Sequence, residues 1–287
     1  FTLGTRLGHN DFSGLEIQPN ARLMWTPNEK HSIWMSVSRA VRTPSRAEND
    51  ATAIVGQPDT TGSFTLPIPI LVALHGNTGF NSEKLIAYEL GYRHQFAPQA
   101  SIDIAGFIND YSQLRDLSFG ALSLSTGLPQ QFILPALANN QASALTYGFE
   151  TSIDWKPLDK WRLQSSYSYL DMHISSNDLL KRLDPTTGGA DKVSPQHQLS
   201  LRSNYDISEK LQLNLWMRYI SKIAFYDIPD YVTMDAKLAF KPVKNVELFL
   251  VGQNLLSQNH REFVADTIPS VPSVIPRGIY VGARWQF

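Results

Sequence analysis

Four arginines stand where a guanidinium group could bind an anionic ligand. They lie in or beside long stretches between predicted strands, and they are Arg42, Arg46, Arg115 and Arg261. A guanidinium presents its N–H donors in a rigid fork, which suits the paired oxygens of carboxylates and catecholates. Surface loops also carry much of the binding function of proteins. The sequence therefore predicts that these arginines contact a carboxylate- or catecholate-bearing ligand.

A structural role is the alternative for the same arginines. Carboxylates occur close to them in the sequence, at Glu48, Asp116 and Glu262. Salt bridges between such neighbours would hold a loop in shape and occupy the guanidinium groups. The sequence alone leaves both interpretations open.

Catalytic and metal-binding patterns are absent from the sequence. There is no Gly-x-Ser-x-Gly, no phosphate-binding glycine-rich loop and no His-Glu-x-x-His. The seven histidines are scattered, with none at i+2 or i+4 from another, and there is no cysteine. The carboxylates Asp110 and Asp116 are most simply solvated loop residues. We therefore expect no catalytic residue, no metal site, no cofactor and no enzyme activity.

Alternation of apolar and polar residues recurs along the whole sequence. Between Leu145 and Trp155, for example, every second residue is apolar or aromatic, apart from Thr151, and the residues between them are polar or glycine. This period is that of a strand with one apolar and one wet face. It predicts about twelve strands, at 1–10, 15–26, 31–43, 84–96, 100–117, 142–156, 161–174, 195–207, 211–223, 231–241, 246–257 and 278–287.

The connections between these strands are of two alternating kinds. The short ones are 26–30, 96–99, 156–160, 208–210 and 241–245. The others are mostly long, at 44–83, 118–141, 175–194, 224–230 and 258–277, and only the hairpin near 11–14 breaks the pattern. Short turns at one rim and long loops at the other are typical of outer-membrane β-barrels. We expect an all-antiparallel, up-and-down sheet with next-neighbour order and no helix longer than two turns.

Aromatic residues give a second indication of a membrane barrel. Next to the short turns, in the apolar register, stand Trp25, Trp155, Trp161 and Trp285, and toward the long loops stand Tyr88, Tyr147, Tyr169 and Tyr219. Two such belts are typical of a bilayer interface. The tryptophans should therefore share the convex face. The concave face should carry Glu89, Glu150, Asp154, Asp235 and Arg284, while Trp34 and Trp216 should pack inside the barrel.

Charge and hydropathy exclude two other classes of protein. The 25 Lys+Arg balance 26 Asp+Glu, and no basic run follows a phosphate backbone, so no nucleic-acid partner is expected. The longest apolar runs, such as 67–74, are far shorter than the roughly 20 residues of a membrane helix. The segment 64–74 is nevertheless unusually apolar for a loop. We expect it either to form a hairpin packed on neighbouring loops or to contact a ligand or another domain.

Three stretches and the chain end resemble the C-terminal part of TonB-dependent outer-membrane receptors. They are residues 34–45, residues 82–93 with Ser82 where proline is usual, residues 251–256, and the terminal Phe287. The similarity spans essentially the whole chain, from 1 to 287, as one barrel domain. It implies a bacterial outer-membrane protein that contacts lipid and takes part in uptake of iron–siderophore complexes, cobalamin or a similarly scarce nutrient.

The resemblance also implies partners and a larger architecture. Receptors of this family have a plug domain inside a 22-stranded barrel, and the TonB–ExbB–ExbD complex acts on that plug. No plug-like sequence is recognised here, so we expect an open C-terminal half-barrel, in which residues 1–10 and 278–287 are not hydrogen-bonded to each other. The alternatives are a small closed porin-like barrel of about twelve strands and an outer-membrane barrel enzyme.

Overall fold

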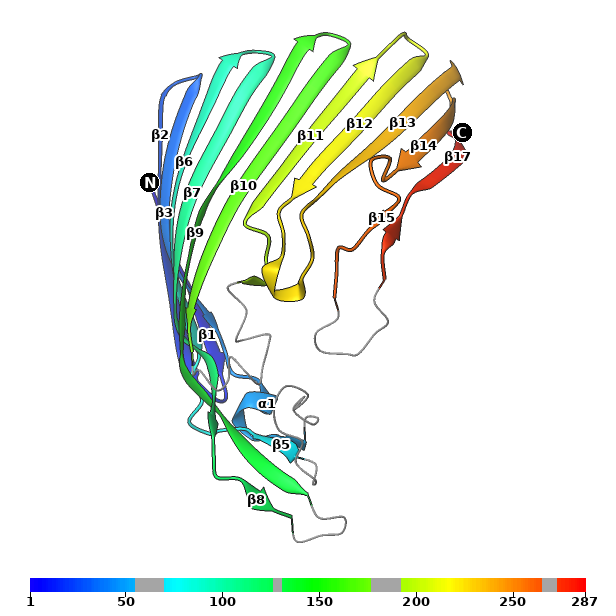
Figure 1. Ribbon diagram of the computed structural model, residues 1–287. Helices are drawn as coiled ribbons and strands as arrows, with labels where there is room; N and C mark the ends of the chain where they lie inside the picture. Colours follow the sequence, from blue (N-terminus) through cyan, green and yellow to red (C-terminus); the bar gives the residue numbers. More distant parts are fainter. Residues whose placement is uncertain (55–69, 126–130, 177–191, 265–272) are drawn as a thin grey trace.

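The computed structural model describes residues 1–54, 70–125, 131–176, 192–264 and 273–287. Twelve strands follow one another along a single continuous sheet (Figure 1). In spatial order they are β1 (Thr2–Asn10), β2 (Gly14–Asn28), β3 (His31–Arg42), β6 (Glu83–Ala97), β7 (Ala100–Phe119), β9 (Phe132–Leu158), β10 (Trp161–Ser175), β11 (His197–Asp206), β12 (Leu211–Ile220), β13 (Tyr231–Val243), β14 (Val246–Gln253) and β17 (Gly278–Trp285). Each of the twelve predicted strands is confirmed, with small shifts at most ends.

The sheet is an open, strongly curved wall. Every neighbouring pair along the path is antiparallel, and β1 and β17 occupy its two ends. Among the described residues, β1 pairs with β2 and β17 with β14, and no ladder joins β1 to β17. The open half-barrel is therefore the correct prediction, and the small closed barrel was the wrong alternative.

The long connections contain short elements of their own. These are α1 (Arg46–Asn49), β4 (Thr52–Ile54), β5 (Ile70–His75), β8 (Ser123–Leu124), the 3-10 helix η2 (Ala224–Tyr226), β15 (Asn259–His260) and β16 (Ile275–Pro276). Both helices are shorter than two turns, as expected, and no helix in the described ranges is long and apolar enough to cross a bilayer. Figure 1 places α1, β5 and β8 beyond one rim of the sheet and the short turns at the opposite rim.

This region differs from the prediction in two details. The path of twelve strands is antiparallel as predicted, but off this path β5 runs parallel to β9 from the pair Ile70–Phe132 to the pair His75–Leu137. Residues 118–141 are not mainly a loop, since β7 continues to Phe119 and β9 begins at Phe132. Residues 132–138 escaped the sequence prediction because Pro135 interrupts an apolar stretch that lacks a wet face.

The apolar segment 64–74 lies partly outside the described residues. Its last residues belong to β5, which forms a hairpin ladder with β4 through the pairs Thr52–His75 and Ile54–Ala73. Since β5 also pairs with β9, the described part packs on a neighbouring connection. Packing on neighbouring connections, one of the two expected roles, is thus seen for residues 70–74, and residues 64–69 lie outside the described residues.

The two faces of the wall follow the predicted registers. Trp155 pairs with Leu163 and Ala100, on the face that carries most of the exposed aliphatic side chains. The other face carries the charges: Asp154 lies opposite Gln164, and Asp235 lies opposite Trp216. Tracing these pairs across the sheet puts the four rim tryptophans on the first face and the five predicted charges on the second.

Candidate functional site

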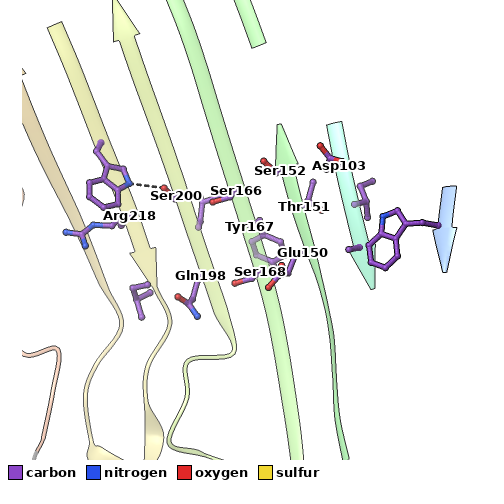
Figure 2. A pocket seen from close by; sticks show the side chains of 16 residues that line it. Asp103, Glu150, Thr151, Ser152, Ser166, Tyr167, Ser168, Gln198, Ser200 and Arg218 are labelled. Carbon is purple, nitrogen blue, oxygen red and sulfur yellow. Dashed lines mark hydrogen bonds between the residues drawn. The ribbon is translucent and has the colours of Figure 1, made fainter. Parts of the chain in front are cut away.

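A cleft of about 550 Å³ identifies the polar face as the concave one (Figure 2). Its lining includes Trp34 on β3 and Trp216 on β12, and strands so far apart along a curved sheet border one space only on the side toward which the sheet bends. The polar side chains that line it include Asp103, Glu150, Ser152, Ser166, Ser168, Gln198, Ser200 and Arg218. The predicted orientation of the two faces is therefore confirmed.

Trp216 is the centre of a cationic cluster in the wall of this cleft. The guanidinium carbons of Arg202 and Arg218 lie 4.3 and 4.4 Å from the centre of its ring. Its indole N–H donates to the Ser200 hydroxyl at 2.8 Å, and this bond is visible in Figure 2. Asp235 lies 3.7 Å from Arg218. The ring is therefore held by a hydrogen bond and by two cations that its π-electrons attract.

The charges of this cluster are unevenly compensated. Asp235 faces Arg218, whose side chain is 31% exposed, whereas Arg202 is exposed and forms no ion pair with any described residue. One net positive charge therefore faces the lumen beside an aromatic ring. This combination can bind an anionic or aromatic group, because guanidinium and indole offer donors and a stacking surface at once.

Trp34 has a different role at the other end of the cleft. It stands opposite Gly91 across the β3–β6 ladder, and a Cβ atom at Gly91 would overlap the indole ring. Packing within the concave face, which the sequence predicts for both Trp34 and Trp216, is confirmed for Trp34. For Trp216 that prediction missed the two arginines. Arg218 lies two residues along the same strand, whereas the stacking of Arg202 depends on the register of β11 against β12.

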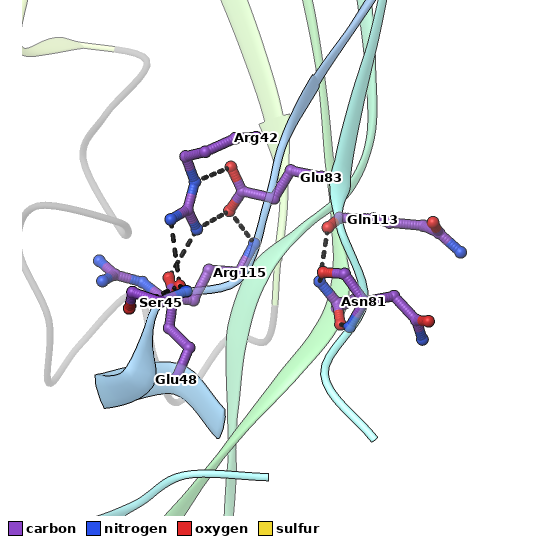
Figure 3. Close-up of polar contacts among 8 residues, drawn as sticks. Arg42, Ser45, Glu48, Asn81, Glu83, Gln113 and Arg115 are labelled. Carbon is purple, nitrogen blue, oxygen red and sulfur yellow. Dashed lines mark hydrogen bonds and ion pairs between the residues drawn. The ribbon is translucent and has the colours of Figure 1, made fainter. Parts of the chain in front are cut away.

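Arg42, the first of the predicted binding residues, is engaged in a network at the outer end of β3 (Figure 3). Its guanidinium donates to both oxygens of Glu83 at 2.6 and 2.7 Å, and to both oxygens of Glu48 at 2.6 and 3.1 Å. Glu83 also accepts the backbone N–H of Arg115 at 2.8 Å. Arg42 thereby joins β3, β6 and β7 to the first long connection.

Glu48 lies on the single-turn helix α1 and completes this network. It accepts the backbone N–H and the hydroxyl of Ser45 at 2.9 and 3.0 Å, so it closes the start of the helix. Burial raises the pKa of the Glu48 carboxyl, but the hydrogen bonds from Arg42 and Ser45 outweigh it and leave the pKa below its ordinary value of 4.5. The carboxylate is therefore stabilised in its charged form.

The other three predicted arginines are exposed and do not gather at one point. Arg46 forms an exposed pair with Asp50 at 3.6 Å. Arg115 lies four residues before the end of β7, and Arg261 follows β15; neither forms an ion pair with another described residue. Glu262 contacts His260 at 2.6 Å instead. Of the expected loop salt bridges, the one between Arg42 and Glu48 is confirmed.

Known proteins resemble the chain in both sequence and fold. Residues 1–255 match the family described as TonB dependent receptor-like, beta-barrel. A probable TonB-dependent siderophore receptor of Acinetobacter baumannii, PiuA, is 25% identical over 138 residues, which cover 44% of this chain and 18% of that protein.

Solved structures of receptors align with almost the entire chain. The siderophore receptor PirA of Acinetobacter baumannii matches 99% of this chain and 43% of its own, at 17% identity and a TM-score of 0.72. A mutant ferric enterobactin receptor (PfeA) of Pseudomonas aeruginosa, in complex with enterobactin, gives a TM-score of 0.74 at 17% identity, again with 99% and 43% covered. The chain thus spans less than half the length of these receptors. It belongs to the TonB-dependent receptor family, whose members are bacterial outer-membrane receptors and not enzymes.

Proposed function

We propose that this chain forms part of the barrel wall of a receptor that takes up an iron chelate or a similarly large, scarce nutrient. The concave face is the side along which the ligand travels, and the convex face contacts outer-membrane lipid. The observation that carries the proposal is the cleft on the concave face, with Trp216 and Arg218 in its wall and Arg202 stacked on the Trp216 ring.

The chemistry of this cluster favours an anionic chelate. Siderophores hold iron through oxygen donors such as carboxylates and catecholates, so their surfaces present anionic or aromatic groups. A guanidinium without a carboxylate partner attracts the former, and the Trp216 ring stacks with the latter. The names of PiuA, PirA and the ferric enterobactin receptor, all of them iron-related, support the same ligand class.

Outer-rim residues supply the first contact in this proposal. Arg46, Arg115 and Arg261 are exposed on or beside the long connections, where an arriving ligand would meet them. Arg42 is already bound by Glu48 and Glu83, so it orients the connection that carries Arg46. We therefore assign ligand contact to the three exposed arginines and loop positioning to Arg42.

Active transport requires partners outside this chain. In the proposed mechanism a plug domain closes the lumen, and the TonB–ExbB–ExbD complex acts on that plug to open a path. The barrel wall holds the plug and guides the ligand. The concave face has mixed charges, such as Glu150 and Arg218, which suits a wall that contacts both.

Growth under iron limitation tests the proposal. A strain lacking the full-length receptor should fail to grow on at least one ferric catecholate or carboxylate siderophore, and the plasmid-borne receptor should restore growth. A receptor with its TonB-contacting segment deleted serves as the control and should not restore growth. Equal growth of all strains on every siderophore and on cobalamin would contradict the proposal and favour a passive pore.

A further inference from the structure

A hollow interrupts the convex, lipid-facing side of the wall. Gly106 on β7 stands between Leu90 on β6 and Phe149 on β9, so three neighbouring lipid-facing positions meet there and the middle one has no side chain. Along β7 the flanking residues of the same face are Ile104 and Ile108, which are 40% and 49% exposed. Gly106 is therefore a gap in a row of bulky apolar residues.

The gap opens into a groove of about 680 Å³ with an almost entirely apolar lining. Aromatic rings border it, and the side chains of the lipid-facing register that line it are Tyr88, Leu90, Tyr92, Ile104, Ile108, Tyr147, Phe149 and Tyr169. Water gains few hydrogen bonds in such a place, and an empty groove loses dispersion contacts along its whole lining.

Packing within the protein does not require the glycine at this position. Added Cβ atoms at Gly91 and Gly148 would overlap Trp34 and the Tyr169 backbone, so those two glycines are needed for close approach. At Gly106 the nearest atom to an added Cβ is the Gly148 carbonyl oxygen at 3.8 Å, an ordinary van der Waals distance. Its φ also lies outside the left-handed region. The effect of this glycine is to leave the groove open.

We propose that the groove binds one acyl chain of an outer-membrane lipid. It is continuous with the face that already contacts the hydrocarbon of the bilayer, and its lining matches a polymethylene chain. Polar groups border it at both ends. Tyr147 donates to Asp171 at 2.8 Å and stacks with His173 at 6.0 Å toward the long-loop rim, and Tyr92 hydrogen-bonds His31 at 2.8 Å toward the short-turn rim. The acyl chain therefore lies between these two polar ends and passes Gly106.

Lipid titration of the delipidated full-length receptor, followed by native mass spectrometry, tests this proposal. The probe is dipalmitoyl phosphatidylethanolamine in detergent micelles. Wild type should bind one lipid more tightly than the rest. The Gly106→Leu variant fills the groove and should bind that lipid at least about fourfold more weakly, the change expected for losing contact with a single methylene group.

Two controls make the outcome specific. Ala283→Leu adds similar bulk on the exposed lipid-facing side of β17, away from the groove, and should bind as wild type does. A dihexanoyl lipid with the same headgroup should not compete for the site. Retained heat-modifiable mobility on gels shows that each variant has folded. Equal affinities of wild type and folded Gly106→Leu, or full competition by the dihexanoyl lipid, would overturn the proposal.

Discussion

Trp34 and Gly91 face each other across the β3–β6 ladder, and the indole ring occupies the space where a side chain at Gly91 would lie. Trp34 also lines the concave cleft on the β3 side. Two glycines on adjacent strands of the wall thus have different roles. Gly91 makes room for the Trp34 ring on the concave side, whereas Gly106 leaves an open groove on the lipid side.

Gly91→Ala should destabilise the barrel, because the added methyl group forces the Trp34 ring out of its position. Overpacking of this kind costs about 1–3 kcal/mol. The midpoint of denaturant unfolding in lipid vesicles measures it. Gly106→Ala is the matched control and should stay within about 0.5 kcal/mol of wild type, since its Cβ meets no close neighbour. Equal effects of the two substitutions would contradict the packing of Trp34.

The two faces of β9 should respond differently to a new charge. Ile153→Arg places a cation on the lipid-facing side, two residues from the Trp155 belt, and should cost about 1–2 kcal/mol, between the costs near the interface and at the midplane. Ser152→Arg, one residue away, points into the cleft and should cost less than about 1 kcal/mol. Folding yields and unfolding midpoints in lipid vesicles measure both costs. A larger loss of stability for Ser152→Arg than for Ile153→Arg would mean that the two faces of β9 have been assigned the wrong way round.

Loss of the Arg42 side chain should loosen the first long connection. Arg42→Gln leaves Glu48 and Glu83, whose side chains are only 8% and 14% exposed, without their cation. Losing these charged hydrogen bonds should cost about 1.5–3 kcal/mol. Hydrogen exchange of the amides in α1 reports the change. Arg46→Gln removes only an exposed pair with Asp50 and should change protection by less than about 0.5 kcal/mol.

The stabilising contribution of Glu48 to this network should persist in mild acid and be lost in stronger acid. The pKa of Glu48 in the folded protein is below its ordinary value of 4.5, so its contribution to stability is fully present above pH 4.5. That contribution is lost as the pH falls through the lowered pKa. Exchange protection of α1, corrected for intrinsic rates, should match at neutral pH and at about pH 5, then fall below about pH 4. Glu48→Gln should show no such step.

Arg202 should contribute to affinity for an anionic chelate. Arg202→Gln removes one of the two cations stacked on Trp216 and should weaken binding by the full-length receptor about fivefold, corresponding to roughly 1 kcal/mol. Calorimetry with the ferric chelate that supports growth measures the change. Lys244→Gln, in the short turn between β13 and β14, makes the same charge change and should leave the affinity unchanged. Equal losses of affinity in the two variants would mean that the effect comes from the change in the receptor's net charge and not from a contact of Arg202 with the chelate.

Most of the wall could be predicted from the sequence because successive side chains of a strand point to opposite faces of the sheet. The alternation from Leu145 to Trp155 determines both the strand and its two faces, and the position of Trp155 near a short turn determines its rim. Where alternation is absent, prediction failed. Residues 70–74 form an apolar run, and nothing in such a run indicates a parallel partner on β9.

The candidate site was predicted less completely, for a geometric reason. Arg202 and Trp216 belong to different strands, and their contact depends on the register of β11 against β12. A shift of two residues would preserve both faces and separate the pair. At the outer rim the proximity of Arg42 to Glu48 could be read from the sequence, whereas Glu83 enters from a distant strand.

The length of β9 has a mechanical consequence. Its 27 residues would extend about 90 Å, against an apolar band of roughly 25 Å, and its ladder with β7 continues to the pair Phe119–Ala136. The ladder is irregular only around Gln113, which has a φ of 55° and whose carbonyl accepts the Asn140 amide at 2.8 Å. Strands β7 and β9 therefore continue as one paired ribbon well beyond the apolar band, and a contact made on this ribbon, far from the membrane, is connected to the wall by a run of paired strand.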